Sequence, residues 1–125
     1  MRLLLDTHAF LWWQAGGSEL TSAARQAIES QDTVVYVSAA SAWEIAIKQA
    51  KGRLESPTDV AEAVDANGFH ELPISVVHAQ SVGALPPHHN DPFDRLLIAQ
   101  AKLEGLTIVT RDPAFKAYGV ALLIA

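Results

Sequence analysis

Four acidic residues occupy positions in this sequence at which a carboxylate needs a physical explanation. Each lies within or directly beside an apolar segment, and the four are Asp6, Glu44, Asp94 and Asp112. A lone charge in apolar surroundings is costly, so such a carboxylate must be solvated, paired or bound to a cation. If the four converge in the fold, the chemistry that they could support is the binding of a divalent metal ion.

The first two acids also have local explanations. Asp6 follows the apolar run Leu3–Leu5 and could cap a helix that begins after it. Glu44 lies in the segment Ala39–Ile47, which is apolar nearly all round and is therefore expected to be buried on most sides. An ion pair with Lys48 could account for Glu44, although such a pair contributes only about 0.3–0.5 kcal/mol. These local roles leave a shared site open.

The other two acids have local explanations as well. Asp91 precedes Pro92 and is the expected cap of a helix, which puts Asp94 in the first turn, where a carboxylate favours the helix dipole. Asp91 and Asp94 share a helix face, so either could reach a site. We assign Asp94 to the site, because Asp91 is better explained as the cap. Asp112 precedes Pro113 and could cap a short helical turn.

The elements that must position these acids alternate along the chain. Short apolar strands are predicted at 3–5, 33–37, 69–72, 106–109 and 120–124. Helices are predicted at 8–14, 21–30, 38–51, 56–67, 75–85 and 91–105, with a helical turn at 113–118. Ser56 and Pro57 supply the predicted start of the fourth helix. This alternation predicts an α/β fold in which helices cover both faces of a parallel sheet.

The carboxyl ends of parallel strands meet at one edge of the sheet, and ligands bind beyond that edge. We therefore expect Asp6, Glu44, Asp94 and Asp112 to lie close together. Two unit charges about 4 Å apart repel by roughly 4 kcal/mol at an effective dielectric constant near 20, so the cluster needs protons or cations within it. Ligand sets made of oxygen atoms suit hard cations, which predicts Mg²⁺ or Mn²⁺ rather than zinc.

Composition restricts the class of protein. The chain has 125 residues, which predicts a single domain spanning 1–125, and it has no cysteine, which excludes a disulfide scaffold and a thiolate site. No signal-peptide pattern and no apolar stretch long enough to span a membrane is present, so we expect a soluble, cytoplasmic protein. The net charge of −5 argues against a passive nucleic-acid binder, because such binding depends on neutralising phosphates. It does not argue against an enzyme that meets phosphates through cations.

Four segments in register resemble one known family. The segments Leu3–His8, Ser38–Ile45, Asn90–Ala101 and Val109–Asp112 resemble the PIN-domain family, and more closely the VapC-type toxins of type II toxin–antitoxin systems. The match runs in order over almost the whole chain.

The resemblance implies a PIN-like three-layer α/β/α fold with a five-stranded parallel sheet. It implies a Mg²⁺- or Mn²⁺-dependent endoribonuclease that hydrolyses phosphodiester bonds in RNA. It also implies a VapB-type antitoxin that blocks the acidic site, and a homodimer. The family's catalytic acids correspond to Asp6, Glu44, Asp94 and Asp112, and its hydroxyl after the fourth strand corresponds to Thr110.

Some polar residues near these motifs are left without a role. His88 and His89 lie in a proline-rich loop, and together with Asp91 they are subgroup features to which the sequence assigns no function. Basic residues could form a local rim that steers RNA toward the acids, and the candidates are Lys48, Lys51, Arg53, Arg95 and Arg111.

Two other readings of the sequence compete with a nuclease. A PIN fold could serve as a non-catalytic interaction module, and loss of one acid would indicate it, but none of the four is missing. An aspartate-based phosphotransfer domain also places aspartates at strand ends. A dehalogenase-type site needs a second aspartate two residues after the first, where this chain has His8. A receiver domain needs an acceptor aspartate after a central strand and a lysine near the last one, and neither is convincing here.

Overall fold

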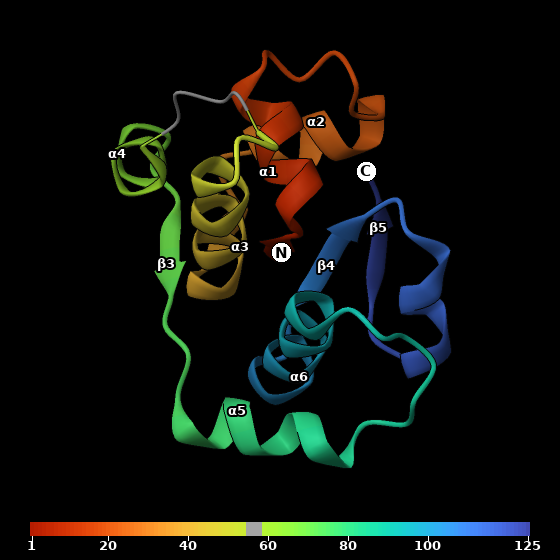
Figure 1. Ribbon diagram of the computed structural model, residues 1–125. Coiled ribbons are helices and arrows are strands. Elements are labelled where there is room, and N and C mark those ends of the chain that lie inside the picture. Colours follow the sequence, from red (N-terminus) through yellow and green to blue (C-terminus); the bar gives the residue numbers. More distant parts are fainter. Residues whose placement is uncertain (55–58) are drawn as a thin grey trace.

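A computed structural model describes residues 1–54 and 59–125 of the chain (Figure 1). Within these residues the strands are β1 (Arg2–Leu5), β2 (Val34–Ser38), β3 (His70–Leu72), β4 (Thr107–Thr110) and β5 (Leu122–Ile124). They form a five-stranded parallel sheet in the order β3-β2-β1-β4-β5, with β3 and β5 at opposite edges. The predicted five-stranded parallel sheet is confirmed.

The α-helices of the described residues are α1 (Thr7–Gln14), α2 (Ser22–Glu29), α3 (Ala39–Ala50), α4 (Val60–Ala66), α5 (Val76–Ser81) and α6 (Pro92–Glu104). Two short 3₁₀ helices, η1 (Val82–Ala84) and η2 (Pro113–Tyr118), complete the described elements. None of the helices in the described part of the chain is long and apolar enough to cross a membrane.

The side chains of β1 point alternately to the two faces of the sheet and contribute to two separate parts of the core. Leu3 and Leu5 pack with residues of α1, α2, α3 and α4 on one face of the sheet. Leu4 packs with residues of α6 and η2 on the other face. Successive side chains of a strand point to opposite faces, so a run of three leucines can serve both layers. The three-layer α/β/α arrangement predicted from the sequence is confirmed.

Several boundaries differ from the prediction. Thr110 is the last residue of β4 rather than the first residue after it, because its pairing with Ile124 extends the strand. The helix predicted to run to about residue 85 ends as α5 at Ser81 and continues as the tighter η1. The predicted cap at Ser56 lies outside the described residues, within which α4 begins at Val60 after the cap Asp59.

The helix α3 is less covered than its composition predicts. Its buried residues are Ala40, Ser41, Glu44 and Ile45, which lie on one face. Trp43 is 59% exposed, although its ring contacts Phe93 of α6 edge-on at 5.1 Å. The expectation that α3 is buried on most sides is therefore wrong for this chain taken alone.

The strand order also bears on the phosphotransfer alternative. Receiver domains have the flavodoxin-like order 2-1-3-4-5, in which the first strand lies between the second and the third. Here β1 lies between β2 and β4. The sheet is therefore not that of a receiver domain.

Candidate metal centre

The register of the sheet brings three strand ends to one level. Leu5 of β1 pairs with Val37 of β2 and with Val109 of β4. The next residue, Asp6, continues the ladder by donating its backbone N–H to the Val109 carbonyl at 3.1 Å. The carboxyl ends of these strands therefore open onto the same edge of the sheet.

Asp6 is fixed at this edge by its role as the cap of α1. Its Oδ1 accepts a hydrogen bond from the backbone N–H of Ala9 at 2.8 Å. Burial raises the pKa of Asp6 above its ordinary value, while hydrogen bonds from the Thr110 side chain and the Ala9 backbone oppose the rise. Asp6 therefore caps a helix and lies at the edge of the sheet, as both predictions state.

Glu44 comes from α3 and has both oxygens occupied. Thr7 Oγ1 donates to Oε1 at 2.7 Å, and Lys48 Nζ donates to Oε2 at 2.9 Å. The ion pair with Lys48, given from the sequence as the local explanation of Glu44, is therefore present. The side chain of Glu44 is 8% exposed, so its charge is balanced within the protein rather than by solvent.

Asp94 enters from the first turn of α6 and meets a histidine. Its Oδ2 lies 2.8 Å from Nε2 of His89. Burial raises the pKa of Asp94 to about 6, with the negative charges of Asp91 and Asp6 adding to the rise and His89 opposing it. The raised pKa of Asp94 therefore reflects its burial first and the neighbouring negative charges second.

Asp112 approaches the same nitrogen of His89 as Asp94 does. Its Oδ1 caps η2 by accepting from the backbone N–H of Ala114 at 2.9 Å, and its own backbone N–H donates to Thr110 Oγ1 at 3.1 Å. Its Oδ2 is 3.5 Å from His89 Nε2. Thr110 therefore contacts both Asp6 and Asp112.

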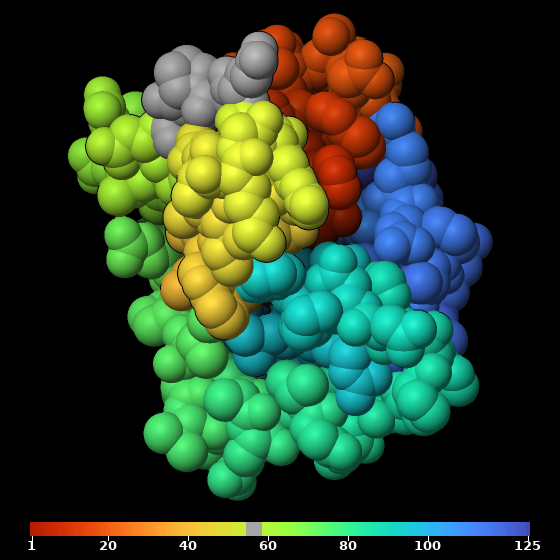
Figure 2. All heavy atoms as spheres, in the orientation of Figure 1, coloured from red at the N-terminus to blue at the C-terminus, as the bar shows by residue number. Residues whose placement is uncertain are grey.

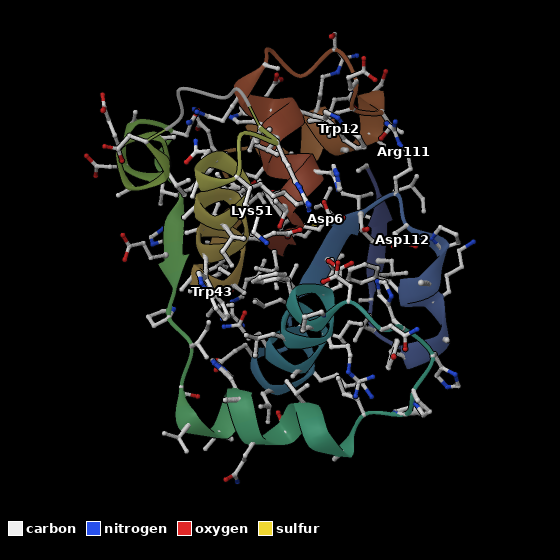
Figure 3. All side chains as sticks on the ribbon, in the orientation of Figure 1. Asp6, Trp12, Trp43, Lys51, Arg111 and Asp112 are labelled. Atoms are coloured by element: carbon white, nitrogen blue, oxygen red, sulfur yellow. The ribbon has the colours of Figure 1, made fainter. Side chains whose placement is uncertain are left out.

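The predicted acids line one cavity of about 180 Å³, together with other polar side chains: Asp6, Thr7, His8, Glu44, Lys48, His89, Asp91, Asp94 and Asp112. In Figure 2 the segments that contribute them meet on the face shown, with α1 in red, α3 in yellow, the start of α6 in cyan and the β4–η2 segment in blue. Figure 3 shows Asp6 and Asp112 on facing sides of this region.

A divalent cation fits this set of residues. Among the described residues, the cavity is lined by five carboxylates and one lysine. Hard cations take carboxylate oxygens as ligands, and a positive charge at the centre would relieve the mutual repulsion that burial intensifies. The raised pKa values of Asp6 and Asp94 are the physical sign of that repulsion and burial. The arrangement can therefore hold a divalent ion, as the sequence predicts.

Two of the predicted RNA-steering arginines have structural tasks instead. The guanidinium of Arg95 donates to the carbonyls of Val82, Leu85, Pro86 and His89 and to the hydroxyl of Tyr118. Arg111 donates to the carbonyls of Ala125 and Glu19 and stacks on the Trp12 ring at 4.4 Å. Both Nη atoms of Arg95 are thus taken up by hydrogen bonds that fix the loop before α6 and are not free to contact a phosphate.

Of the other basic residues predicted to form the rim, one lines the acidic cavity and the others lie outside it. Lys48 lines the acidic cavity, whereas Lys51 and Arg53 are exposed and do not line it. Arg111 and Trp12 line a neighbouring cavity of about 310 Å³ with His8, Asp6 and Asp112. Figure 3 shows Trp12 and Arg111 lying together beside the acids.

His89 is the site residue to which sequence reasoning gave no role. Its ligand nitrogen and the carboxylates of Asp94 and Asp112 form, among the described residues, a group whose atoms all lie within 4.8 Å of one another. His88, its neighbour, is exposed and contacts the Tyr118 ring at 5.4 Å. The two histidines are equivalent in the sequence, so only the folded loop distinguishes them.

The fold and site thus define a three-layer α/β protein with an acidic cavity at the carboxyl edge of a parallel sheet. The model of the PIN domain matches residues 3–121, and the chain belongs to the PIN-domain family.

Known relatives agree with this assignment. Ribonuclease VapC22 of Mycobacterium tuberculosis is 31% identical over 119 residues, which cover 93% of this chain and 91% of that protein. The predicted resemblance to VapC-type toxins is confirmed.

Solved structures share the fold at low sequence identity. VapBC2 from Rickettsia felis, solved bound to a DNA fragment from its promoter, superposes with a TM-score of 0.69 at 15% identity, covering 98% of both chains. A toxin–antitoxin complex from Klebsiella pneumoniae superposes with a TM-score of 0.67 at 19% identity, covering 98% of this chain and 96% of the other. At these identities the likeness is one of fold.

Proposed function

We propose that this protein is a metal-dependent endoribonuclease, the toxin of a toxin–antitoxin pair, which hydrolyses phosphodiester bonds in RNA. The observation that carries the proposal is the convergence of Asp6, Glu44, Asp94 and Asp112 on one cavity of a PIN fold. The relative VapC22, which covers nearly the whole chain, is named a ribonuclease.

The ion that fits this centre is Mg²⁺ or Mn²⁺. Asp6, Asp94 and Asp112 would hold it, and Glu44 would be the weakest of the four ligands because both of its oxygens are already hydrogen-bonded. When bound, a divalent ion activates a water molecule and neutralises the charge that develops on the phosphate. Thr110 contributes by holding Asp6 and Asp112 in place.

The chain's own residues can carry the remaining steps. Lys48 Nζ lines the cavity and can donate to a non-bridging phosphate oxygen of the substrate. When Lys48 donates to the phosphate, Glu44 Oε2 is released and would accept the proton of the attacking water as the new oxygen–phosphorus bond forms. The bond from phosphorus to the leaving ribose oxygen breaks, and that oxygen takes up a proton from solvent water.

Cleavage of a single-stranded RNA in the presence of Mn²⁺ tests the proposal. The wild type should cleave, whereas Asp6→Ala and Asp94→Asn should not. Asp65→Asn is a matched control, because Asp65 is an exposed acid on α4 outside the cavity. Equal cleavage by all four proteins would contradict the site assignment.

We also propose a protein antitoxin of the VapB type as a partner. Support comes from the fold neighbours, whose structures are a VapBC complex and a toxin–antitoxin complex. An antitoxin that blocks the acidic cavity would inhibit cleavage in proportion to its occupancy, which titration of the two proteins in the cleavage assay would measure.

We propose that the protein forms a homodimer. Large apolar side chains on α3 and α5 are exposed in the single chain: Trp43 by 59%, Val76 by 79% and Val77 by 54%. Burial of such groups drives association. Sedimentation should show a dimer for the wild type and a shift toward monomer for Trp43→Ser. Leu103→Ser is the control, since Leu103 is an exposed apolar residue near the C-terminal end of α6.

A further inference from the structure

His89 is held in one place by contacts at both of its backbone groups. Its N–H donates to the hydroxyl of Tyr118 at 2.8 Å, and its carbonyl accepts from Arg95 at 3.2 Å. Its ring lies edge-on to Phe115, with centroids 5.9 Å apart. Tyr118 is fixed in turn, because its hydroxyl donates to the Pro86 carbonyl at 2.9 Å. The direction of the imidazole is therefore set by the fold.

The imidazole points between two carboxylates. Nε2 lies 2.8 Å from Asp94 Oδ2 and 3.5 Å from Asp112 Oδ2. Neighbouring ligands of an octahedral ion with bonds of about 2.1 Å lie about 3 Å apart. The two measured separations lie on either side of that value, and one ligand atom from each of the three residues lies within 4.8 Å of the other two. The three side chains are therefore close enough to share one ion.

We propose that His89 is a nitrogen ligand of the metal centre and that it gives the centre a preference for Mn²⁺ over Mg²⁺. The proposal rests on the proposed function, because it assumes that the acidic cavity holds a divalent ion. Imidazole nitrogen suits first-row transition ions, whereas Mg²⁺ takes oxygen ligands and keeps much of its water. A site of carboxylates alone would discriminate far less between the two ions.

A purely orienting role for His89 makes a different prediction. As a hydrogen-bond donor that fixes Asp94, His89 would support the binding of Mn²⁺ and Mg²⁺ equally. Glutamine at this position can still donate from its amide to Asp94 but offers no imidazole nitrogen. The variant His89→Gln therefore separates the two roles.

Calorimetric titration of the full chain with Mn²⁺ alone and Mg²⁺ alone tests the ligand role. We expect the wild type to bind Mn²⁺ at least about tenfold more tightly than Mg²⁺. His89→Gln should lose about 10–100-fold in Mn²⁺ affinity and much less in Mg²⁺ affinity. His88→Gln is the matched control and should match the wild type, because His88 does not line the cavity.

Pulsed electron paramagnetic resonance of the Mn²⁺-loaded wild type gives a readout that needs no folded variant at position 89. A nitrogen hyperfine coupling to Mn²⁺ is expected. It should persist in His8→Gln, which removes the other imidazole lining the cavity, and in His88→Gln. Absence of the coupling, or equal losses of Mn²⁺ and Mg²⁺ affinity in His89→Gln, would overturn the ligand role alone. A folded wild type that binds neither ion would overturn the proposed function as well.

Discussion

The two sides of the acidic cavity differ in how their charge is balanced. On the α3 side, Glu44 is held by Thr7 at 2.7 Å and neutralised by Lys48 at 2.9 Å. On the α6 side, Asp94 and Asp112 both lie close to Nε2 of His89, and burial raises the pKa of Asp94 to about 6. The negative charge on the α3 side is balanced by a lysine of the protein, whereas the negative charge on the α6 side still needs a cation to balance it.

This difference indicates where each part of the chemistry belongs. A cation binds most strongly where carboxylates are close together and lack a permanent partner. We therefore expect Asp6, Asp94 and Asp112 to bind the ion. We expect Lys48 and Glu44, on the α3 side, to act on the substrate.

The largest expected effect is that of Asp94→Asn. Two unit charges about 4 Å apart interact by roughly 4 kcal/mol at an effective dielectric constant near 20, so removing one carboxylate beside a divalent ion should weaken binding by at least that amount. This corresponds to a loss of about 10³-fold in ion affinity, since each 1.4 kcal/mol is about tenfold. Calorimetry with Mn²⁺ measures the loss, and cleavage should fall with it. Retained ion affinity would show that the α6 side is not the ion-binding part.

A double substitution on the α3 side should have a smaller effect on the ion. Glu44→Gln with Lys48→Met removes a carboxylate and an ammonium together, so the net charge of the cavity is unchanged. We expect ion affinity to fall by no more than about tenfold, because the ion is held mainly on the other side. Cleavage should still fall by about 10²-fold or more, since the proton acceptor is lost.

Lys48→Met and Lys51→Met then form a matched pair for RNA affinity. Lys48 lines the cavity, and Lys51 is an exposed lysine outside it. Loss of one phosphate contact should reduce the slope of log affinity against log salt by about 0.7 for single-stranded RNA. Lys48→Met should show this reduction, and Lys51→Met should not. An equal reduction in both would assign RNA binding to the outer rim instead.

The pH dependence of stability provides the next test of the α6 side. The pKa of Asp94 rises from 3.8 to about 6 on folding, so the folded state binds more protons than the unfolded state between these values. Stability from this group is fully present below about pH 4 and is lost as the pH rises to about 6. Burial raises the pKa of Asp6 in the same direction.

Urea unfolding of metal-free protein between pH 4 and pH 7 measures this dependence. Other carboxylates also titrate, so the difference between the wild type and Asp94→Asn isolates the contribution of Asp94. Above pH 6, Mn²⁺ at about 100 times its dissociation constant should stabilise the wild type by about 2.7 kcal/mol. If the difference in unfolding free energy between the wild type and Asp94→Asn did not change with pH, the raised pKa of Asp94 would be contradicted.

Much of the fold and the acidic cluster could be predicted because both depend on short-range patterns. Apolar runs define the strands, and the carboxyl ends of parallel strands must share an edge, which places Asp6 and Asp112 together. The caps at Asp6, Asp91 and Asp112 follow from residue type and position. These inferences need the local sequence patterns and the general rule for parallel sheets, but no particular side-chain contact between distant segments.

The missed features depend on contacts between distant parts of the chain. His89 reaches the cavity because Tyr118 and Arg95 hold its backbone, and no local pattern distinguishes it from His88. The same contacts explain why Arg95 is not available to RNA. Trp43 is exposed because no segment of the described chain covers that face of α3. The apolar composition of α3 gives no sign that this face is uncovered.

The smallest effect expected concerns Asp91, which belongs to the α6 side both as a cap and as a charge. Its Oδ1 accepts from the backbone N–H groups of Phe93 at 2.9 Å and Asp94 at 3.1 Å, and its charge contributes to the raised pKa of Asp94. Asp91→Ala removes both roles and should cost about 1 kcal/mol of stability. Asp91→Ser keeps a capping oxygen and removes only the charge, so it should lie within a few tenths of a kcal/mol of the wild type near pH 5.

The two variants at Asp91 should nevertheless agree on one property. Both lower the pKa of Asp94, because both remove a negative charge beside it. The fall in stability with rising pH should therefore be completed at a lower pH in each than in the wild type. If Asp91→Ser matches the wild type both in stability and in pH dependence, Asp91 acts only as a cap. The negative charge that contrasts with the neutralised α3 side would then come only from Asp94 and Asp112 on the α6 side and from Asp6.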